Sequence, residues 1–160
     1  STKTNNQFYI ALRFRLELSN FDNNFILSLI ANNKQHKLGF VANYNTLFLT
    51  DGDNLYNIGS ISNSTWNSFG VFVKEISNTN LSIDIYINNN EPINILLPYK
   101  NISGLFFALG SDSFVDNQSF DSSNSLYGYM ENIIYGYDSF SNVDFQNYHN
   151  GLLFVECNKV

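Results

Sequence analysis

The feature that most constrains the fold is a run near the N-terminus, QFYIALRFRLEL at residues 7–18, in which apolar side chains occupy every second position. The apolar series runs from Phe8 to Leu18, and the positions between its members carry a mixture that includes Arg13 and Arg15. Successive side chains of a β-strand point to opposite faces of the strand. The run therefore predicts a strand with one buried face and one mixed face.

Further runs rich in apolar residues follow along the chain, separated by clusters of Asn, Asp, Ser and Gly. Apolar runs bounded by such turn residues are typical of short antiparallel strands. The pattern predicts an all-β fold, a two-sheet antiparallel sandwich or a barrel. The further predicted strands are residues 25–32, 36–43, 46–51, 68–76, 81–88, 92–98, 104–110, 126–138 and 151–158.

A single short helix is expected near the C-terminus, in the segment SNVDFQNYHNG at residues 141–151. Ser141 or Asn142 can act as the N-cap, because a short polar side chain there accepts a hydrogen bond from the first turn. Asp144 falls in that first turn, where a negative charge is favoured, and Gly151 is a typical helix stop.

Length and composition fit one domain over residues 1–160. The hydrophobic fraction of 44% suffices for a sizeable core, and no linker-like segment divides the chain. The sequence has neither an initiator Met nor a signal-peptide pattern, so we expect it to be part of a longer polypeptide. Its single cysteine, Cys157, cannot form an internal disulfide, and pairing outside this chain stays open.

The charge balance argues against two classes of partner. The chain has 8 Lys and Arg against 14 Asp and Glu, a formal net charge of −6, whereas nucleic-acid phosphates require clusters of basic residues. No apolar run approaches the roughly 20 residues that a membrane-spanning helix needs. We therefore expect neither nucleic-acid binding nor membrane insertion.

Three patterns in the last two thirds of the chain resemble the concanavalin A-like superfamily, and its laminin-G-like branch in particular. In residues 64–94, Trp66 opens a strand and the next strand ends in Tyr-Ile-Asn at 86–88. Residues 102–113 are similar to the strand that leads to the rim loop, and residues 126–152 are similar to the closing strand and the short helix. The resemblance implies a jelly-roll sandwich of two antiparallel sheets.

A narrower resemblance is to the heads of rotavirus-type spike proteins, which share a galectin-like sandwich of similar size. The segment NYHNGL at residues 147–152 and the Asn-rich, Lys-poor composition carry it. It implies attachment to a host cell from an extracellular or virion surface. The galectin sugar signature, His-x-Asn-x-Arg with a later Trp-Gly-x-Glu-x-Arg, is absent, so a galectin-type galactose site does not carry over.

The sequence lacks the patterns of a glycoside hydrolase or of a nucleophile triad. A sandwich glycosidase requires two carboxylates flanking the scissile bond, and the Glu-x-Asp-x-x-Glu run of the superfamily's hydrolases is absent. Asp84 and Glu131 stand alone and are expected to be solvent-facing charges. His36 and His149 are expected at the surface, without the acid that orients a catalytic histidine. We therefore predict that the protein is not an enzyme.

Calcium is the one metal for which the sequence offers ligands. Ca²⁺ takes hard oxygen ligands, and the laminin-G resemblance implies an ion at the rim between two loops. Asp and Asn are also the best turn formers, so plain turns explain the same residues and both interpretations stay open. No other cofactor is expected. The candidate ligands are Asp51 and Asp53 in TDGDN, and Asp112 and Asp116 in GSDSFVDNQSFDSSN.

An aromatic surface is the leading candidate for recognition. In residues 126–138 four tyrosines occupy alternate positions, which predicts a strand with phenols on one face and aliphatic side chains on the other. Sugar sites combine an aromatic platform with a few convergent polar groups. Trp66 is the only Trp, and a buried role for it in the core is the alternative. The candidate glycan-binding residues are Trp66, Tyr56, Tyr127, Tyr129, Tyr135 and Tyr137.

The sequence thus predicts a non-catalytic, lectin-like recognition domain with a cell-surface glycan as partner. A viral spike or a microbial surface protein is the kind of larger polypeptide that would carry such a head. The alternative is a protein-binding or structural laminin-G-like module of an extracellular protein.

Overall fold

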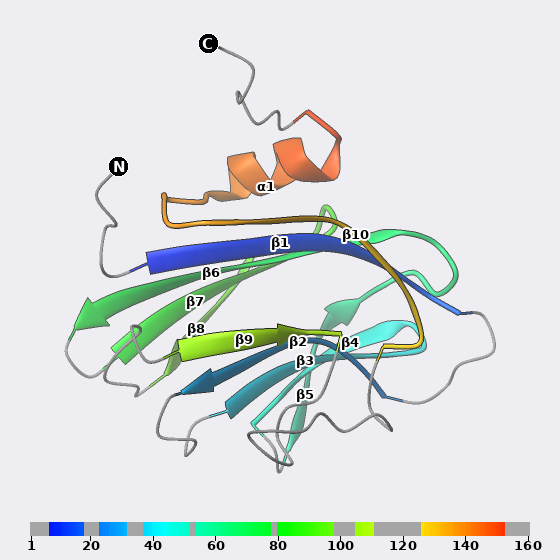
Figure 1. Ribbon diagram of the computed structural model, residues 1–160, viewed down its shortest axis with the longest axis horizontal. Coiled ribbons are helices and arrows are strands. Elements are labelled where there is room, and N and C mark those ends of the chain that lie inside the picture. The colour runs from blue at the N-terminus through cyan, green and yellow to red at the C-terminus, as the bar shows by residue number, and fades with distance from the viewer. Residues whose placement is uncertain are drawn as a thin grey trace.

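The computed structural model describes residues 7–17, 23–31, 37–51, 54–77, 80–97, 105–110 and 126–152. Two five-stranded antiparallel sheets pack face to face, and helix α1 (Asn142–His149) lies on the outer side of one of them (Figure 1). This arrangement confirms the predicted sandwich with one short helix near the C-terminus.

Sheet A carries the helix and has the strand order β10-β1-β6-β7-β8, while sheet B has the order β5-β4-β3-β2-β9. The strands are β1 (Gln7–Leu16), β2 (Asn24–Ala31), β3 (Lys37–Asn43), β4 (Thr46–Thr50), β5 (Leu55–Ser60), β6 (Asn67–Ser77), β7 (Asn80–Ile87), β8 (Ile93–Leu97), β9 (Leu105–Leu109) and β10 (Gly128–Gly136).

Strand β5, at the edge of sheet B, is the strand that the sequence did not predict. Its LYNIGS run shows no useful alternation, and Leu55 and Tyr56 are 50% and 51% exposed. An edge strand that buries little needs no apolar face, so its sequence resembles that of a loop. Of the strand predicted at 151–158, only Gly151 and Leu152 are described, and neither is in a strand; the rest lies outside the described residues.

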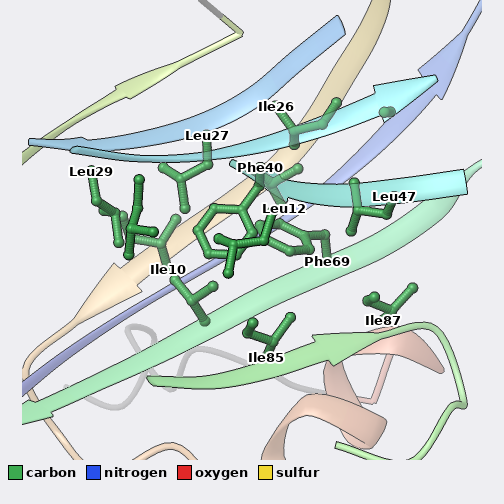
Figure 2. Packing of buried hydrophobic residues seen from close by; sticks show 14 of the residues in the cluster. Ile10, Leu12, Ile26, Leu27, Leu29, Phe40, Leu47, Phe69, Ile85 and Ile87 are labelled. Atoms are coloured by element: carbon green, nitrogen blue, oxygen red, sulfur yellow. The ribbon is translucent and has the colours of Figure 1, made fainter. Parts of the chain in front are cut away.

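The main core lies between the two sheets. The apolar series of β1 points into it, and Ile10, Leu12 and Phe14 are each no more than 1% exposed. Phe40 of β3 meets Phe69 of β6 across the interface, with ring centres 5.0 Å apart (Figure 2). Each side chain of this size contributes about 1.5–3 kcal/mol when fully buried. The apolar side chains that alternate along the sequence of β1 therefore form part of the contact between the two sheets.

Ser141, one of the two predicted caps, is the N-cap of helix α1. The Ser141 hydroxyl accepts a hydrogen bond from the Asp144 N–H, and the Asp144 carboxylate accepts one from the Ser141 N–H, at 3.2 and 2.8 Å. This reciprocal capping box fixes the first turn. Among the described residues, no helix is long and apolar enough to cross a membrane.

The helix packs on the outer face of sheet A through Phe145 and Tyr148. Gly70 of β6 makes room for this contact, because a Cβ added there would lie only 3.0 Å from the Phe145 ring. The result is a second, smaller core under α1, made of Ala11, Phe72, Tyr86, Phe140, Phe145 and Tyr148.

Strand β10 contains a β-bulge that the sequence does not reveal. Asn132 has a φ of 51°, and the register between β1 and β10 shifts between Ala11 and Arg13. A bulge inserts one extra residue, so side chains beyond it point to the opposite face from the one that simple alternation predicts.

The bulge divides the tyrosines of residues 126–138 between two faces. Tyr129 pairs with Arg15 and shares the outer face of sheet A, whereas Tyr135 pairs with Ile10 of the main core. The expectation that the tyrosines form one row is therefore wrong. The aliphatic side chains divide in the same way, with Met130 packed on the main core and Ile134 on the second core.

Candidate functional site

The part of the outer face that lies next to α1 carries three side chains from three neighbouring segments of sheet A. Tyr129 of β10 pairs with Arg15 of β1, and Trp66 immediately precedes Asn67, which pairs with Phe14. The Arg15 Cζ lies 4.7 Å from the centre of the Tyr129 ring and 5.6 Å from that of the Trp66 ring. We call Arg15, Trp66 and Tyr129 the Arg15 cluster. Its cation is flanked by two aromatic rings, each within cation–π distance.

The next pair along the strands is an ion pair. Arg13 Nη1 lies 3.2 Å from Glu131 Oε1, and the two side chains are 31% and 39% exposed. Arg13 also approaches Trp66, with its Cζ 5.8 Å from the ring centre. A pair this exposed contributes about 0–1 kcal/mol to stability. Its more useful effect is local, because Glu131 balances the charge of Arg13.

The two arginines of β1 therefore differ in their partners. Within the described ranges, Arg13 has Glu131 as its carboxylate partner, while Arg15 makes no ion pair and no hydrogen bond through its side chain. Glu131 was expected to be a lone surface charge, and the structure shows that it is paired. Asp84 lies apart from it on β7 and accepts a hydrogen bond from Asn94 Nδ2 at 2.7 Å.

Trp66 is held in place by the buried side chain of Asn67. The Asn67 amide donates hydrogen bonds to the backbone oxygens of Ser62 and Thr65 at 2.7 and 3.1 Å. Its carbonyl oxygen accepts from the Ser62 N–H at 2.8 Å and from Asn88 Nδ2 at 3.1 Å. These bonds close the turn that precedes β6, so the backbone that carries Trp66 is held rigidly. Trp66 is half-buried on the outer face of sheet A, and the alternative of a core position for it is wrong.

The end of α1 borders the site. His149 Nδ1 lies 2.7 Å from the hydroxyl of Ser68, which pairs with Arg13 across β1 and β6. Burial, and then the positive charge of Arg13, lower the pKa of His149 below its ordinary value of 6.5. His149 was expected at the surface, but it is half-buried and stacks on Phe145 with ring centres 6.4 Å apart. A neutral imidazole at this position keeps a second positive charge away from Arg13.

Only two of the six predicted sugar-binding residues come together, Trp66 and Tyr129. Tyr127 lies two residues before Tyr129, is 61% exposed, and donates its N–H to Asn24 Oδ1 at 2.8 Å. Tyr56 belongs to the edge strand of sheet B and does not contribute to the outer face of sheet A.

Tyr135 and Tyr137 lie beyond the bulge, at the other end of β10. Tyr135 is 66% exposed, and its backbone pairs with Ile10 rather than with an outward-facing residue. The Tyr137 carbonyl accepts a hydrogen bond from Gln7 Nε2 at 3.0 Å. The structure therefore does not bring these two tyrosines to the Arg15 cluster.

Sequence reasoning missed both arginines as site residues. It placed Arg13 and Arg15 on the outward face of their strand without giving them a role. The available signal was their spacing, because two of the 8 basic residues stand two positions apart on one strand face. What the sequence could not supply was the register that places Tyr129 and Trp66 on either side of Arg15.

The calcium interpretation stays a prediction. Asp51 is exposed, and its Oδ1 accepts a hydrogen bond from the N–H of Asn54, three residues on, at 2.9 Å, a local side-chain-to-backbone contact of the kind that turns use. Asp53, Asp112 and Asp116 lie outside the described residues. In the parts of the chain that the structure describes, no three His, Cys, Asp or Glu side chains form a group that could hold a metal ion.

Comparison with known proteins supports the fold and leaves the family open. No protein-family model matches the chain, and no curated protein matches it in sequence. Solved structures do match. A heptameric SAP-like pentraxin from Limulus polyphemus superposes with a TM-score of 0.61 at 12% identity, over 91% of this chain and 70% of the other. The chain thus has the concanavalin A-like β-sandwich fold.

Two further matches are binding domains. The CBM40 of the Ruminococcus gnavus IT-sialidase has a TM-score of 0.59 at 14% identity, covering 92% of this chain and 84% of the other. The binding domain of botulinum neurotoxin DC, solved in complex with SialylT, has a TM-score of 0.53 at 13% identity. The match covers 95% of this chain and 37% of the other. Enzymes also occur among the matches, so the fold alone does not decide between binding and catalysis.

Proposed function

We propose that this domain is a non-catalytic glycan-binding module that holds a sugar against the Arg15 cluster. The observation that carries the proposal is the convergence of Trp66, Arg15 and Tyr129 on one sheet face from three separate segments. Aromatic rings suit the apolar face of a sugar ring, and a guanidinium supplies several hydrogen-bond donors for its oxygens. Because all three residues stand on or beside strands, the site needs little rearrangement to bind.

The matched structures support a glycan as the ligand class. One matched binding domain belongs to a sialidase and another was solved with SialylT. On this proposal the partner is a cell-surface glycan, and the domain works outside the cell or on a virion as part of a longer attachment protein. A laminin-G-like module that binds protein is the alternative, and a blank result with sugars would favour it.

The non-catalytic part of the proposal rests on the acidic residues. In the described part of the chain, Glu131 is paired with Arg13 and Asp84 is hydrogen-bonded to Asn94. A sandwich glycosidase instead needs two carboxylates that flank the scissile bond, one of them held protonated. Incubation of the domain with any glycan that it binds should release no reducing ends. Reducing-end release that disappears in Glu131→Gln would contradict this part of the proposal.

A glycan array tests the binding proposal directly. The isolated domain should give reproducible hits that weaken at least tenfold in Trp66→Ala and Tyr129→Ala, on the scale of one to a few kcal/mol for an aromatic contact of about this size. Tyr56→Ala is the matched control, because Tyr56 is 51% exposed against 48% for Tyr129 but lies on sheet B. Repeating the array with EDTA asks whether calcium takes part. A blank array would sink the proposal, and hits lost only in Tyr56→Ala would move the site to sheet B.

A further inference from the structure

We infer that the Arg15 cluster selects glycans that carry a carboxylate, and that the guanidinium of Arg15 binds this carboxylate. This inference rests on the proposed function of the same site and adds the chemical class of the ligand. Three observations carry it: the charge partners of the two β1 arginines, the surroundings of the Arg15 side chain, and the acidity of the whole chain.

The first observation is the contrast between neighbouring arginines. Arg13 and Arg15 lie on the same strand face, and Glu131 stands 3.2 Å from Arg13. No carboxylate of the described residues lies within ion-pair distance of Arg15. A guanidinium is always charged and presents donors in a planar fork that matches a carboxylate. Arg15 thus has an unused, directional binding capacity.

The second observation is how Arg15 is held. Tyr129 and Trp66 approach its guanidinium from β10 and from the start of β6. An unrestrained arginine loses rotamer freedom when it is fixed, and two flanking rings remove part of that cost before a ligand arrives. The same rings are the platform on which a sugar ring would rest. A sugar lying on either ring would bring its acidic substituent to Arg15.

The third observation is the overall charge. With a net charge of −6, the chain as a whole repels anions, so an unpaired arginine cannot serve general attraction to acidic surfaces. A local receptor for one carboxylate remains compatible with that field, because a direct contact is screened far less than a distant charge. The site should therefore bind a single acidic sugar in contact and ignore polyanions such as nucleic acids.

The experiment compares each acidic sugar with its own neutral form. Carboxylated oligosaccharides, with 3′-sialyllactose and a hexa-galacturonate as the two probes, are titrated beside their methyl esters by calorimetry. The domain should prefer at least one acid over its ester by about 10- to 100-fold, the range of one charge-assisted hydrogen-bonded contact. In Arg15→Gln the ratio of acid to ester affinity should fall to about one, because the acid loses its charge-assisted contact while both forms lose the neutral contacts of the guanidinium equally.

Two further variants keep the test sharp. Lys74→Gln removes the same unit charge from the same face of sheet A, because Lys74 pairs with Gln7 at the opposite end of β1, and it should change nothing. Arg15→Lys keeps the charge but loses the fork, so it should give an intermediate preference. Unfolding midpoints of all variants should match the wild type, since Arg15 lies in the open part of the face.

The outcomes separate the two proposals. Equal binding of acid and ester, or an acid preference that survives in Arg15→Gln, would overturn the acidic-sugar inference and leave glycan binding standing. Failure to bind either probe in any form, together with a blank array, would overturn both. Equal loss of acid preference in Lys74→Gln would show that net charge, and not Arg15, sets the selectivity.

Discussion

The outer face of sheet A has two halves, a covered half under α1 and an open half that carries the Arg15 cluster. Strands β1 and β6 run through both halves but present different side chains in each. Under α1, β1 and β6 present Ala11, Gly70 and Phe72, which are small or apolar. Toward the other end, the same strands present Arg13 and Ser68, followed by Arg15 and Trp66. The first set leaves room for a helix. In the second set, Ser68 is buried against His149 and Arg13 is paired with Glu131, so Arg15 and Trp66 are the side chains that the proposed function uses.

The comparison explains why tyrosine content alone does not locate a site. In the covered half, Tyr86 is 4% exposed and donates its hydroxyl to the Phe140 carbonyl at 3.0 Å, and Tyr9 stacks on Phe140 at 4.4 Å. These rings are part of the second core. In the open half, Tyr129 is 48% exposed and contacts a guanidinium instead. What surrounds a tyrosine ring, and not the presence of the ring itself, therefore distinguishes a core tyrosine from a candidate binding residue.

The largest expected loss of stability comes from a substitution in the core under α1. Phe145 of α1 is fully buried against sheet A, so Phe145→Ala should lower the free energy of unfolding by about 3–5 kcal/mol in urea titration. Tyr129→Ala, in the open half, should cost about 1 kcal/mol or less. Similar losses in the two variants would mean that the open half is also structural, and the comparison would fail.

A smaller loss of stability is expected from a substitution at Asn67, which supports the turn before Trp66. This side chain is fully buried and makes four hydrogen bonds around the turn before Trp66, so Asn67→Ala removes all four and should cost about 1–3 kcal/mol. Because Trp66 is the only Trp, its fluorescence should shift to the red as the turn loosens. Sugar affinity should fall with it.

Asn94→Ala is the control for that variant. Asn94 also donates two hydrogen bonds, to Ser82 Oγ and to Asp84 Oδ1, but it is exposed on β8. Its loss should leave both the fluorescence and the sugar affinity unchanged. An unshifted emission spectrum in Asn67→Ala would show that the Asn67 network does not position Trp66.

The sequence predicted the parts of this molecule that depend on local periodicity. Alternation predicted β1 with its buried and mixed faces, and a cap at Ser141 or Asn142 with Asp144 in the first turn predicted the start of α1. It failed at β10, because the bulge at Asn132 sits at an ordinary polar residue and leaves no trace in the pattern. It also failed for the Arg15 cluster, because Arg15, Trp66 and Tyr129 meet only through the pairing of distant strands.

The tyrosines of the covered half should make the fold sensitive to alkali. Burial, followed by the charges of Asp84 and Asp144, raises the pKa of Tyr86 to about 12 from 10.0. As pH rises from 10 toward 12, the unfolded chain loses this proton and the folded chain keeps it, so stability falls across that window. Urea titrations at several pH values check this, and Tyr86→Phe should show a smaller alkaline loss. An identical loss in Tyr86→Phe would assign the effect to other groups.

The smallest expected effect lies at the border between the halves, at His149. Its folded pKa is lowered from 6.5, so above that pH both states are neutral and the residue does not affect stability. As pH falls below 6.5, the unfolded chain takes up a proton that the folded chain resists, and stability declines until the lowered folded pKa is passed. His149→Gln should remove this decline below pH 6.5, while Arg13→Gln should weaken it by removing the second cause of the lowered pKa. An NMR titration that finds a pKa of 6.5 or higher for the imidazole of His149 would contradict the half-buried, neutral histidine between the second core and the Arg15 cluster.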